Sequence, residues 1–246
     1  MSKSKSDTKT PVKRSFRPIG WATDRFKRIL RFALKLLIIA VTAAAVIVFI
    51  FRFVNPPVNY YMASEWYRLG EMKRHWVPIE TFPDYMARSV VAAEDANFCH
   101  HSGFDFSSIQ KALSGKGKLR GASTLSQQVS KNVFLWHGRS WVRKGFEAGF
   151  TVLVEMLWTK ERIVEVYLNV AEFDEGVFGV GAAARHYFGV QPNKITRLQA
   201  ARLAAVLPSP KTRSASRPTA FVRKRTSQIL SGEATIAADG RADCFQ

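Results

Sequence analysis

The sequence predicts a mainly α-helical domain that follows a single transmembrane helix. A long apolar run lies near the N-terminus, apolar residues recur at helical spacing through residues 88–207, and few segments alternate as strands do. Two capping boxes, Thr124-x-x-Gln127 and Thr196-x-x-Gln199, mark helix starts. With 246 residues, of which 47% are hydrophobic, the chain is long enough to bury the core of one domain of moderate size.

The apolar run covers residues 32–54. Its uncharged centre lies between Lys35 and Arg52, whose long side chains can reach the interface, and with its flanks it attains the ~20 residues that cross a bilayer. A cleaved signal peptide and a buried core helix are the alternatives. We expect a permanent membrane helix, because the run is too long for a signal peptide and is followed by Pro56 and Pro57 instead of a small-residue cleavage site.

The net charge of +18 is unevenly distributed. Up to Arg52 the chain has twelve Lys or Arg residues and two acidic ones. The excess of positive charge before the span predicts that residues 1–31 form a basic cytoplasmic tail and that everything after residue 54 is exported. For a basic exported domain, lipid phosphates and cell-wall precursors are better candidate partners than nucleic acid.

The C-terminal part of the chain is rich in Ser, Arg, Lys and Pro after Pro210. One basic helix is expected near residues 221–230, with a frayed tail from Ser231 onward. The two cysteines, Cys99 and Cys244, are too few and too far apart for a disulfide framework. Because Cys244 lies in a tail with little core-forming content, we expect no bridge between them.

Residues 88–105 carry the first candidate for chemistry. An apolar, helix-compatible run delivers two adjacent carboxylates, Glu94 and Asp95, and aromatic and imidazole side chains follow at once. Partial desolvation raises the pKa of a carboxylate towards the working pH, so this pattern suits a general base. The alternative is a helix that ends in a solvated acidic turn.

A polar helix is expected to begin at Thr124. Ser123, Thr124 and the first free backbone N–H groups would form an anion site at its N-terminus. Two pairs of residues four apart, Gln127 with Lys131 and Gln128 with Asn132, each share one face. Such a helix is either exposed or lines a cleft, and we favour the cleft.

Residues 141–158 form a nearly all-apolar stretch, which predicts a helix at the centre of the fold. Arg143, Lys144 and Glu147 stand at its start with i, i+3 and i, i+4 spacing, and a surface salt-bridge cluster is the alternative for them. Further helices are expected at residues 163–170, closed by a structural Asn169, and at residues 200–207.

Five motifs occur in a fixed order. They are Glu94-Asp-x-x-Phe-x-x-His101-x-Gly-Phe-Asp105, Arg120-Gly-Ala-Ser-Thr-x-x-Gln-Gln-x-x-Lys-Asn132, Arg143-Lys-x-x-Glu147, Lys160-x-x-Ile163-x-x-x-Tyr-Leu-Asn169 and Gly179-x-x-Ala-Ala-x-x-x-Tyr-Phe188. This set resembles the signature of the peptidoglycan glycosyltransferases of family 51, in particular their monofunctional branch. The resemblance covers roughly residues 60–210, and five ordered motifs make it specific.

The resemblance implies a lysozyme-like helical glycosyltransferase domain with a small membrane-apposed lobe, placed at residues 55–215, and a basic, partly disordered extension at residues 216–246. The implied reaction polymerises lipid II into β-1,4-linked glycan strands with inversion and releases undecaprenyl diphosphate, with no transpeptidase activity. The implied partners are lipid II, the lipid-linked glycan chain, the inner membrane, and proteins of cell-wall synthesis or division. Nucleic acid is not expected.

The resemblance also implies roles for individual residues. Glu94 matches the general base, and Glu147 matches a second carboxylate that orients cations. The matching substrate-binding residues are Lys131, Arg143, Lys144, Arg120, Gln127, Gln128, Ser123, Thr124 and Asn132. His101 is expected to brace the Glu94 loop. No cofactor is expected to be required, although a divalent cation (Mg²⁺ or Mn²⁺) on Glu147 is left open, and the segment after Pro210 is not expected to affect the chemistry.

Two other functions compete with this interpretation. A lytic enzyme of lysozyme-like fold would need an acid for the glycosidic oxygen and would have no use for the cations Lys131, Arg143 and Lys144. A membrane-tethered binding protein would use its basic domain on anionic lipid, and its function would survive the loss of the Glu94 carboxylate.

Overall fold

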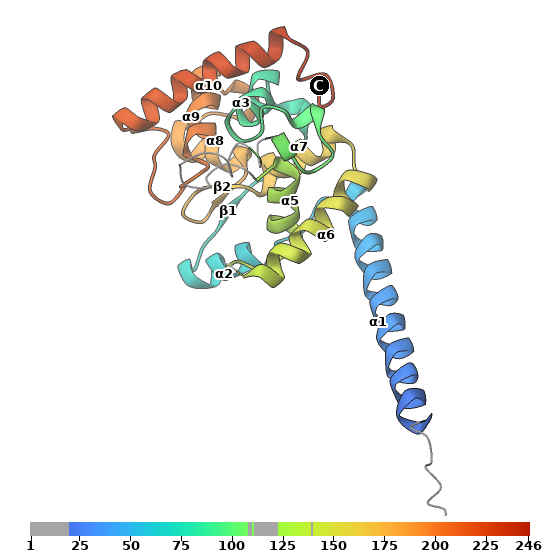
Figure 1. Ribbon diagram of the computed structural model, residues 1–246. Helices are drawn as coiled ribbons and strands as arrows, with labels where there is room; N and C mark the ends of the chain where they lie inside the picture. The colour runs from blue at the N-terminus through green and yellow to red at the C-terminus, as the bar shows by residue number, and fades with distance from the viewer. Residues whose placement is uncertain (1–19, 108–109, 111–122, 139) are drawn as a thin grey trace, which may run out of the picture. The chain divides into compact units, whose positions relative to one another are not determined.

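The computed structural model describes residues 20–107, 110, 123–138 and 140–246 (Figure 1). The helices are α1 (Gly20–Phe53), α2 (Tyr60–Leu69), α3 (Asp84–Glu94), α5 (Leu125–Phe134), α6 (Trp141–Leu157), α7 (Lys160–Val170), α8 (Val180–Phe188), α9 (Arg197–Val206) and α10 (Ala220–Ala238). Short 3-10 turns are η1 (Ile79–Thr81), η2 (Phe98–His100) and η3 (Pro192–Lys194), and the strands are β1 (Lys73–Arg74), β2 (Glu172–Asp174) and β3 (Val177–Phe178). The prediction of a mainly helical domain after one apolar helix is confirmed.

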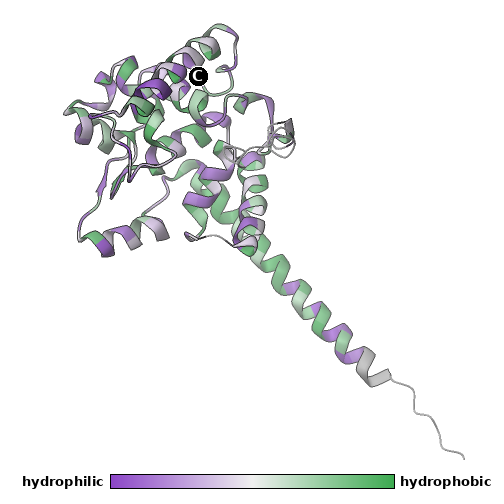
Figure 2. Ribbon diagram, turned by 60° about the vertical axis from the view of Figure 1, so that its left-hand side comes forward, coloured by the Kyte–Doolittle hydropathy of each residue, from purple (hydrophilic) through white to green (hydrophobic). Residues whose placement is uncertain are grey.

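Helix α1 is the one helix of the described residues that is long and apolar enough to cross a membrane. The candidate span is Asp24–Phe53, with a mean hydropathy of 2.8 in its most apolar window. Figure 2 shows the hydrophobic run along this helix, with hydrophilic turns towards its start. The helix begins at Gly20, so Arg25, Lys27, Arg28 and Arg31 belong to the same helix as the apolar run. The chain divides after Ala43, and the compact unit Ala44–Gln246 contains every element from α2 onward.

Helices α3, α9 and α10 form the first helical layer of the compact unit. Helix α10 packs on both α9 and α3 (Figure 1). Helix α9 buries Ala200, Ala201, Ala204 and Ala205, and these small side chains let its two neighbours come close. The cap at Thr196 is the expected capping box, because its side chain accepts from the N–H of residue 199.

The C-terminal segment is a long packed helix followed by a short turn. Val222, Ile229 and Ile236 are each buried and recur every seven residues, so they form one apolar stripe along α10. Phe245, beyond the helix, is also buried. The expectation of a frayed tail from Ser231 is therefore wrong, because a stripe of three widely spaced residues is hidden in an otherwise polar sequence.

Helices α5, α6 and α7 form the second helical group, in which α5 packs on α6 and α7. The apolar sequence of α6 predicted a helix at the centre of the fold, and this prediction is wrong. The helix buries a partly polar stripe that includes Arg143, Glu147 and Thr151, whereas Trp141 and Met156 are 92% and 74% exposed. The helix is amphipathic in the reverse sense, with charge turned towards the protein and apolar side chains turned outward.

A small sheet with the strand order β1-β3-β2 packs against α8. Strand β1 pairs with β3 in parallel, with Lys73 opposite Val177, and β2 pairs with β3 antiparallel. The buried side chain of Asn169 accepts from the N–H of Val77 and donates to its carbonyl, both at 2.8 Å. Asn169 is thus structural, as expected, but it fixes the chain after β1 to α7. Gly179 has a φ of 80°, and a Cβ there would lie 2.9 Å from the Asn169 carbonyl oxygen.

Candidate active site

Glu94 is the last residue of α3, and its carboxylate lies against α5. The side-chain amide of Gln128 donates from Nε2 to Oε2 of Glu94 at 2.9 Å. The hydroxyl of Tyr167, on α7, donates to Oε1 of the same amide at 3.1 Å. Because the amide oxygen already accepts from Tyr167, its NH₂ group is directed at Glu94. Three helices therefore fix one carboxylate oxygen.

Burial raises the pKa of the Glu94 carboxyl above its ordinary value. The hydrogen bond from Gln128 and the charges of Arg225 and Lys131 oppose this shift, and the adjacent Asp95 adds to it. A carboxylate with a raised pKa is a stronger base than an exposed one. The alternative interpretation, in which Glu94 belongs to a solvated acidic turn, is therefore wrong.

Asp95 caps the end of α3 and connects it to α5. Its carboxylate accepts from Nε2 of His101 at 2.9 and 3.1 Å and from the backbone N–H of Leu125 at 2.9 Å. His101 thus braces the loop after Glu94, as the sequence predicted, and it does so by its hydrogen bonds to Asp95. The Asp95 carboxylate therefore occupies the N-terminus of α5, and the prediction of a free anion site there is wrong.

The side chains of Thr124 and Gln127 are used inside the protein. Thr124 Oγ1 donates to the carbonyl of Gly103 at 2.7 Å and accepts from the N–H of Gln127, while Gln127 Oε1 accepts from the N–H of Thr124 at 3.0 Å. The predicted capping box is confirmed, and it uses the hydroxyl of Thr124 and the amide oxygen of Gln127. Ser123 is exposed, and Arg120 lies outside the described residues.

Glu147 binds both cations at the start of α6. Nη1 of Arg143 lies 2.7 Å from Oε2 of Glu147, and the ammonium of Lys144 is hydrogen-bonded to Oε1. Arg143 also donates from Nε to the carbonyl of Gly138 at 2.8 Å. Glu147 is only 3% exposed and Arg143 only 9%, so the surface salt-bridge alternative does not describe them. The carboxylate orients the cations.

The donors around Glu147 do not fit a divalent metal ion. Each of its two oxygens already accepts from a cationic side chain. Among the residues that the structure describes, no group of three or more His, Cys, Asp and Glu side chains is placed to hold a metal. A divalent ion would have to displace Arg143 or Lys144, and we derive no step through one.

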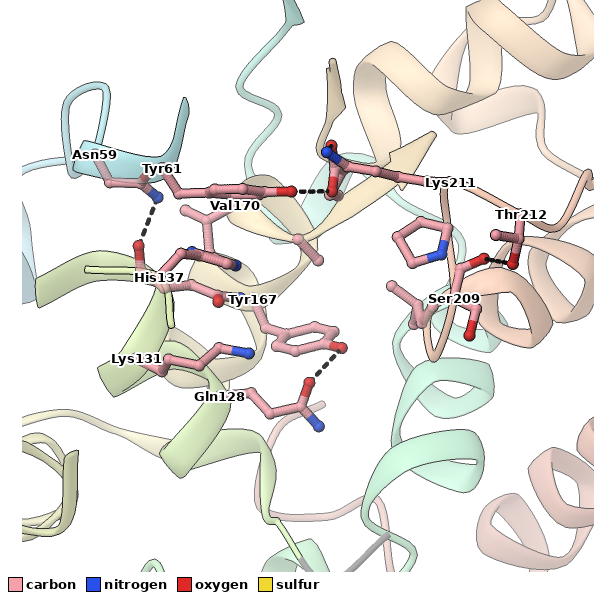
Figure 3. A pocket seen from close by; sticks show the side chains of 15 residues that line it. Asn59, Tyr61, Gln128, Lys131, His137, Tyr167, Val170, Ser209, Lys211 and Thr212 are labelled. Carbon is pink, nitrogen blue, oxygen red and sulfur yellow. Dashed lines mark hydrogen bonds and ion pairs between the residues drawn. The ribbon is translucent and has the colours of Figure 1, made fainter. Parts of the chain in front are cut away.

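Lys131 projects from α5 into a pocket of about 350 Å³ (Figure 3). Within the described part of the chain, no hydrogen bond or ion pair reaches its ammonium group. Burial lowers the pKa of Lys131, and the charge of Glu147 partly offsets this. Gln128, Asn132 and Tyr167 line the same pocket, so the predicted cleft face of α5 is confirmed. An unpaired, desolvated cation in a pocket is ready to bind an anion.

The opposite side of the pocket was not identified from the sequence. Tyr61 donates to Oε2 of Glu172 at 2.7 Å and stacks on the ring of His137 with centroids 3.5 Å apart. The ammonium of Lys211 lies 2.8 Å from Oε2 of Glu65. Burial, with help from nearby cations, lowers the pKa of His137 to about 4, so its ring is neutral at pH 7. These residues come from segments without a recognisable motif, and only the fold brings them together.

The site combines a partly buried basic carboxylate with cations that face a pocket, in a helical domain that follows a candidate membrane helix. This combination suits a transferase whose leaving group is anionic. Residues 62–233 match the transglycosylase family. The chain is 54% identical over 189 residues to the biosynthetic peptidoglycan transglycosylase of Jannaschia sp. (strain CCS1), covering 77% of this chain and 79% of that protein.

Two further relatives carry the same name. The protein of Caulobacter vibrioides is 46% identical over 223 residues, covering 89% of this chain and 97% of the relative. The protein of Pseudomonas aeruginosa is 48% identical over 215 residues, covering 83% of this chain and 90% of the relative. The chain belongs to the transglycosylase family, and α1 is compatible with a single-pass membrane anchor.

Proposed function

We propose that the protein polymerises lipid II into peptidoglycan glycan strands, with the growing lipid-linked chain as donor and with inversion at the reacting carbon. The observation that carries this proposal is the arrangement on α5. Gln128 holds the partly buried Glu94 carboxylate, and Lys131, one turn further along the same helix, presents to the adjoining pocket an ammonium group that has no partner among the described residues. A base and an anion-binding group therefore lie side by side.

Each group has a defined task in this reaction. Glu94 takes the proton from the 4-hydroxyl of the acceptor sugar while that oxygen attacks C1 of the donor sugar. The bond from C1 to the lipid diphosphate breaks with inversion, and negative charge develops on the leaving oxygen. Lys131 stabilises this charge, and Arg143 and Lys144, held in place by Glu147, add to the positive field. Asn132 lines the same pocket as Lys131.

The apolar surfaces support action at a membrane. Besides the apolar residues of α1, the exposed side chains include Trp141, Val142, Phe146 and Met156 of helix α6. An aromatic and apolar helix face of this kind is suited to a membrane interface. We place the protein in the inner membrane as a single-pass protein, with its N-terminus in the cytoplasm and its catalytic domain in the periplasm. A bond between Cys99 and Cys244 supports this orientation, because disulfides persist in oxidising compartments.

Polymerisation of lipid II by the purified full-length chain tests the proposal. We expect glycan polymer from the wild type and a loss on the order of 10²–10⁴-fold in Glu94→Gln, the range that a general base contributes. Glu147→Gln should lose activity less completely, because it disorders cations and leaves the base in place. Thermal unfolding of each variant serves as the control for folding.

Three results would contradict the proposal. A folded wild type that binds lipid II without forming polymer would leave a binding protein. Full activity in Glu94→Gln would remove the base from the mechanism. Shortening of preformed glycan strands, without growth from lipid II, would favour a lytic enzyme.

A further inference from the structure

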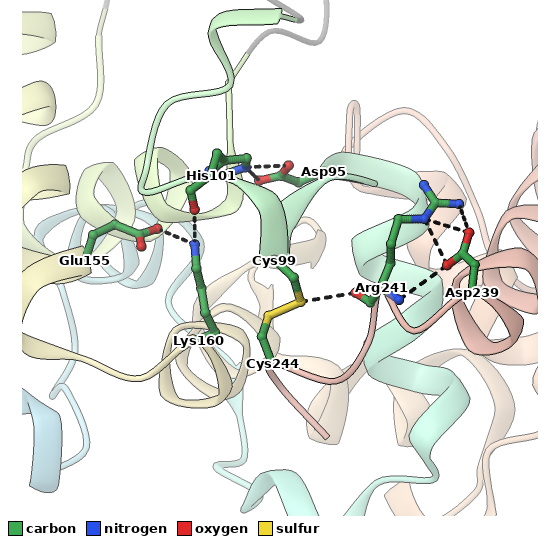
Figure 4. The surroundings of a disulfide bond; sticks show 8 residues. All are labelled: Asp95, Cys99, His101, Glu155, Lys160, Asp239, Arg241 and Cys244. Carbon is green, nitrogen blue, oxygen red and sulfur yellow. Dashed lines mark hydrogen bonds and ion pairs between the residues drawn. A yellow bond between two sulfur atoms is a disulfide. The ribbon is translucent and has the colours of Figure 1, made fainter.

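The C-terminal segment contacts the Glu94 loop at several points. The Cys99–Cys244 disulfide joins residues 145 positions apart in the sequence, and Sγ of Cys99 lies 3.1 Å from the carbonyl oxygen of Arg241 (Figure 4). The side chain of Arg241 donates to the carbonyl of Ala96 at 3.3 Å, and the ring of Phe245 lies 6.2 Å from that of Phe98. The segment after the predicted catalytic motifs thus holds the loop that carries the base.

Helix α10 brings a charge to this loop as well as packing. Nη2 of Arg225 donates to the carbonyl of Ala93, the residue directly before Glu94, at 2.8 Å. The two helices approach so closely that a Cβ at Gly232 would lie 3.3 Å from Cβ of Ala92. The carbonyls in the last turn of a helix lack partners within the helix and form its negative end. Arg225 therefore binds the end of α3 at the point where the base emerges.

We propose that Arg225 is a positioning residue for Glu94: it fixes the last turn of α3 and places a permanent positive charge next to the carboxylate. This inference rests on the proposed role of Glu94 as general base. It assigns a part in the chemistry to the segment after Pro210, for which the sequence predicted none.

The charges around Glu94 explain why a permanent cation is useful there. Gln128 and Lys131 face it from α5, the Tyr167 hydroxyl lies beyond Gln128 on α7, and Asp95 follows it in the chain. Burial favours the protonated carboxyl, which is useless as a base. Burial also favours the neutral form of Lys131, whereas a guanidinium keeps its charge throughout the working range of pH. Among these charges, that of Arg225 lowers the pKa of Glu94 more than that of Lys131 does.

A pH–rate series on the full-length protein tests the inference. Arg225→Gln should move the acid limb of the polymerisation rate to higher pH, because the pKa of Glu94 rises when the cation is lost. A rise of one unit gives about a tenfold lower rate on the acid limb and recovery at high pH. Arg225→Lys keeps the positive charge, so the acid limb of its pH–rate profile should lie close to that of the wild type. Arg223→Gln, an identical change on the same helix at an exposed residue, should leave the profile unchanged.

A second measurement does not depend on activity. The ¹³C chemical shift of the Glu94 carboxyl, assigned by its absence in Glu94→Gln, reports the pKa in detergent-solubilised wild type and in Arg225→Gln. A higher pKa in Arg225→Gln supports the inference. An unchanged pKa, or a uniform loss of rate at all pH values, overturns it. A shifted pKa in a wild type that forms no polymer would instead contradict the proposed function and leave the electrostatic role of Arg225 standing.

Discussion

Gln128 and Glu94 form a hydrogen bond of 2.9 Å between α5 and the end of α3, and the direction of this bond is fixed by Tyr167. This one hydrogen bond affects both the position of the Glu94 carboxylate and its pKa. It holds one carboxylate oxygen in place, and it stabilises the charged form of the group against the effect of burial. A change at Gln128 should therefore alter both the geometry and the titration of Glu94.

The first prediction concerns Gln128→Leu. This change removes the donor to Glu94, so the pKa of the carboxyl should rise further and the acid limb of the polymerisation rate should move to higher pH. We expect a rate about tenfold lower on the acid limb, which corresponds to one unit of pKa. Tyr167→Phe keeps the ring and removes only the hydroxyl that orients the amide, so its shift should be in the same direction and smaller. Superimposable profiles for Gln128→Leu and wild type would contradict the prediction.

The second prediction concerns the cost of burying the Glu94 carboxylate. Its folded-state pKa is raised, so the folded state binds the proton more tightly than the unfolded chain does, and stability falls as the pH rises from the unfolded pKa through the folded one. Glu94→Gln removes this cost. The variant should unfold at a higher temperature than wild type at pH 8, and the difference should vanish below about pH 4, where the carboxyl is protonated in both states. Equal differences at pH 4 and pH 8, measured by thermal unfolding in one detergent, would argue against a raised pKa.

The sequence predicted the features that depend on neighbouring residues. The helix starts at Thr124 and Thr196 follow from capping boxes that span four residues, and α1 follows from one continuous apolar run. The pocket-lining face of α5 that carries Gln128 and Asn132 follows from helical spacing. Each of these patterns is local, so its geometry is determined before the chain folds around it.

The features that the sequence missed depend on contacts between distant segments. Composition alone cannot show that the buried stripe of α10 faces α3 and α9, or that Cys99 meets Cys244 across 145 residues. The reversed polarity of α6 was missed because an apolar helix is expected to be buried, whereas here Arg143 and Glu147 are buried as a pair and the apolar residues face outward. Pairing offsets part of the desolvation penalty that usually keeps charges at the surface.

The third prediction concerns the Cys99–Cys244 bridge. The bond closes a loop of well over 100 residues, so replacing both cysteines with alanine should destabilise the domain by about 2–5 kcal/mol through the greater freedom of the unfolded chain. The apparent unfolding temperature should fall by roughly 2–4 °C for each kcal/mol lost. Reduction of the wild type should reproduce the shift, and reductant should have no effect on the double variant. An unfolding temperature that is the same with and without reductant would show that the bridge does not stabilise the domain.

The fourth prediction contrasts two partly buried lysines, Lys131 and Lys160. Lys131 has no partner among the described residues and a pKa lowered by burial, so its charge costs stability at every pH below its folded pKa. Lys160 donates to the carbonyl of His101 at 2.7 Å and to Glu155 at 3.0 Å (Figure 4). At pH 7, Lys131→Met should therefore raise the unfolding temperature while polymerisation falls on the order of 10²–10³-fold, because the charge on the leaving group loses its nearest cation. Lys160→Met should lower the unfolding temperature, by an amount that corresponds to about 1–3 kcal/mol for the buried acceptors left without a donor. A stabilised but inactive Lys131→Met would show that this cation is retained for substrate and not for the fold, whereas destabilisation of both variants would assign Lys131 a structural role.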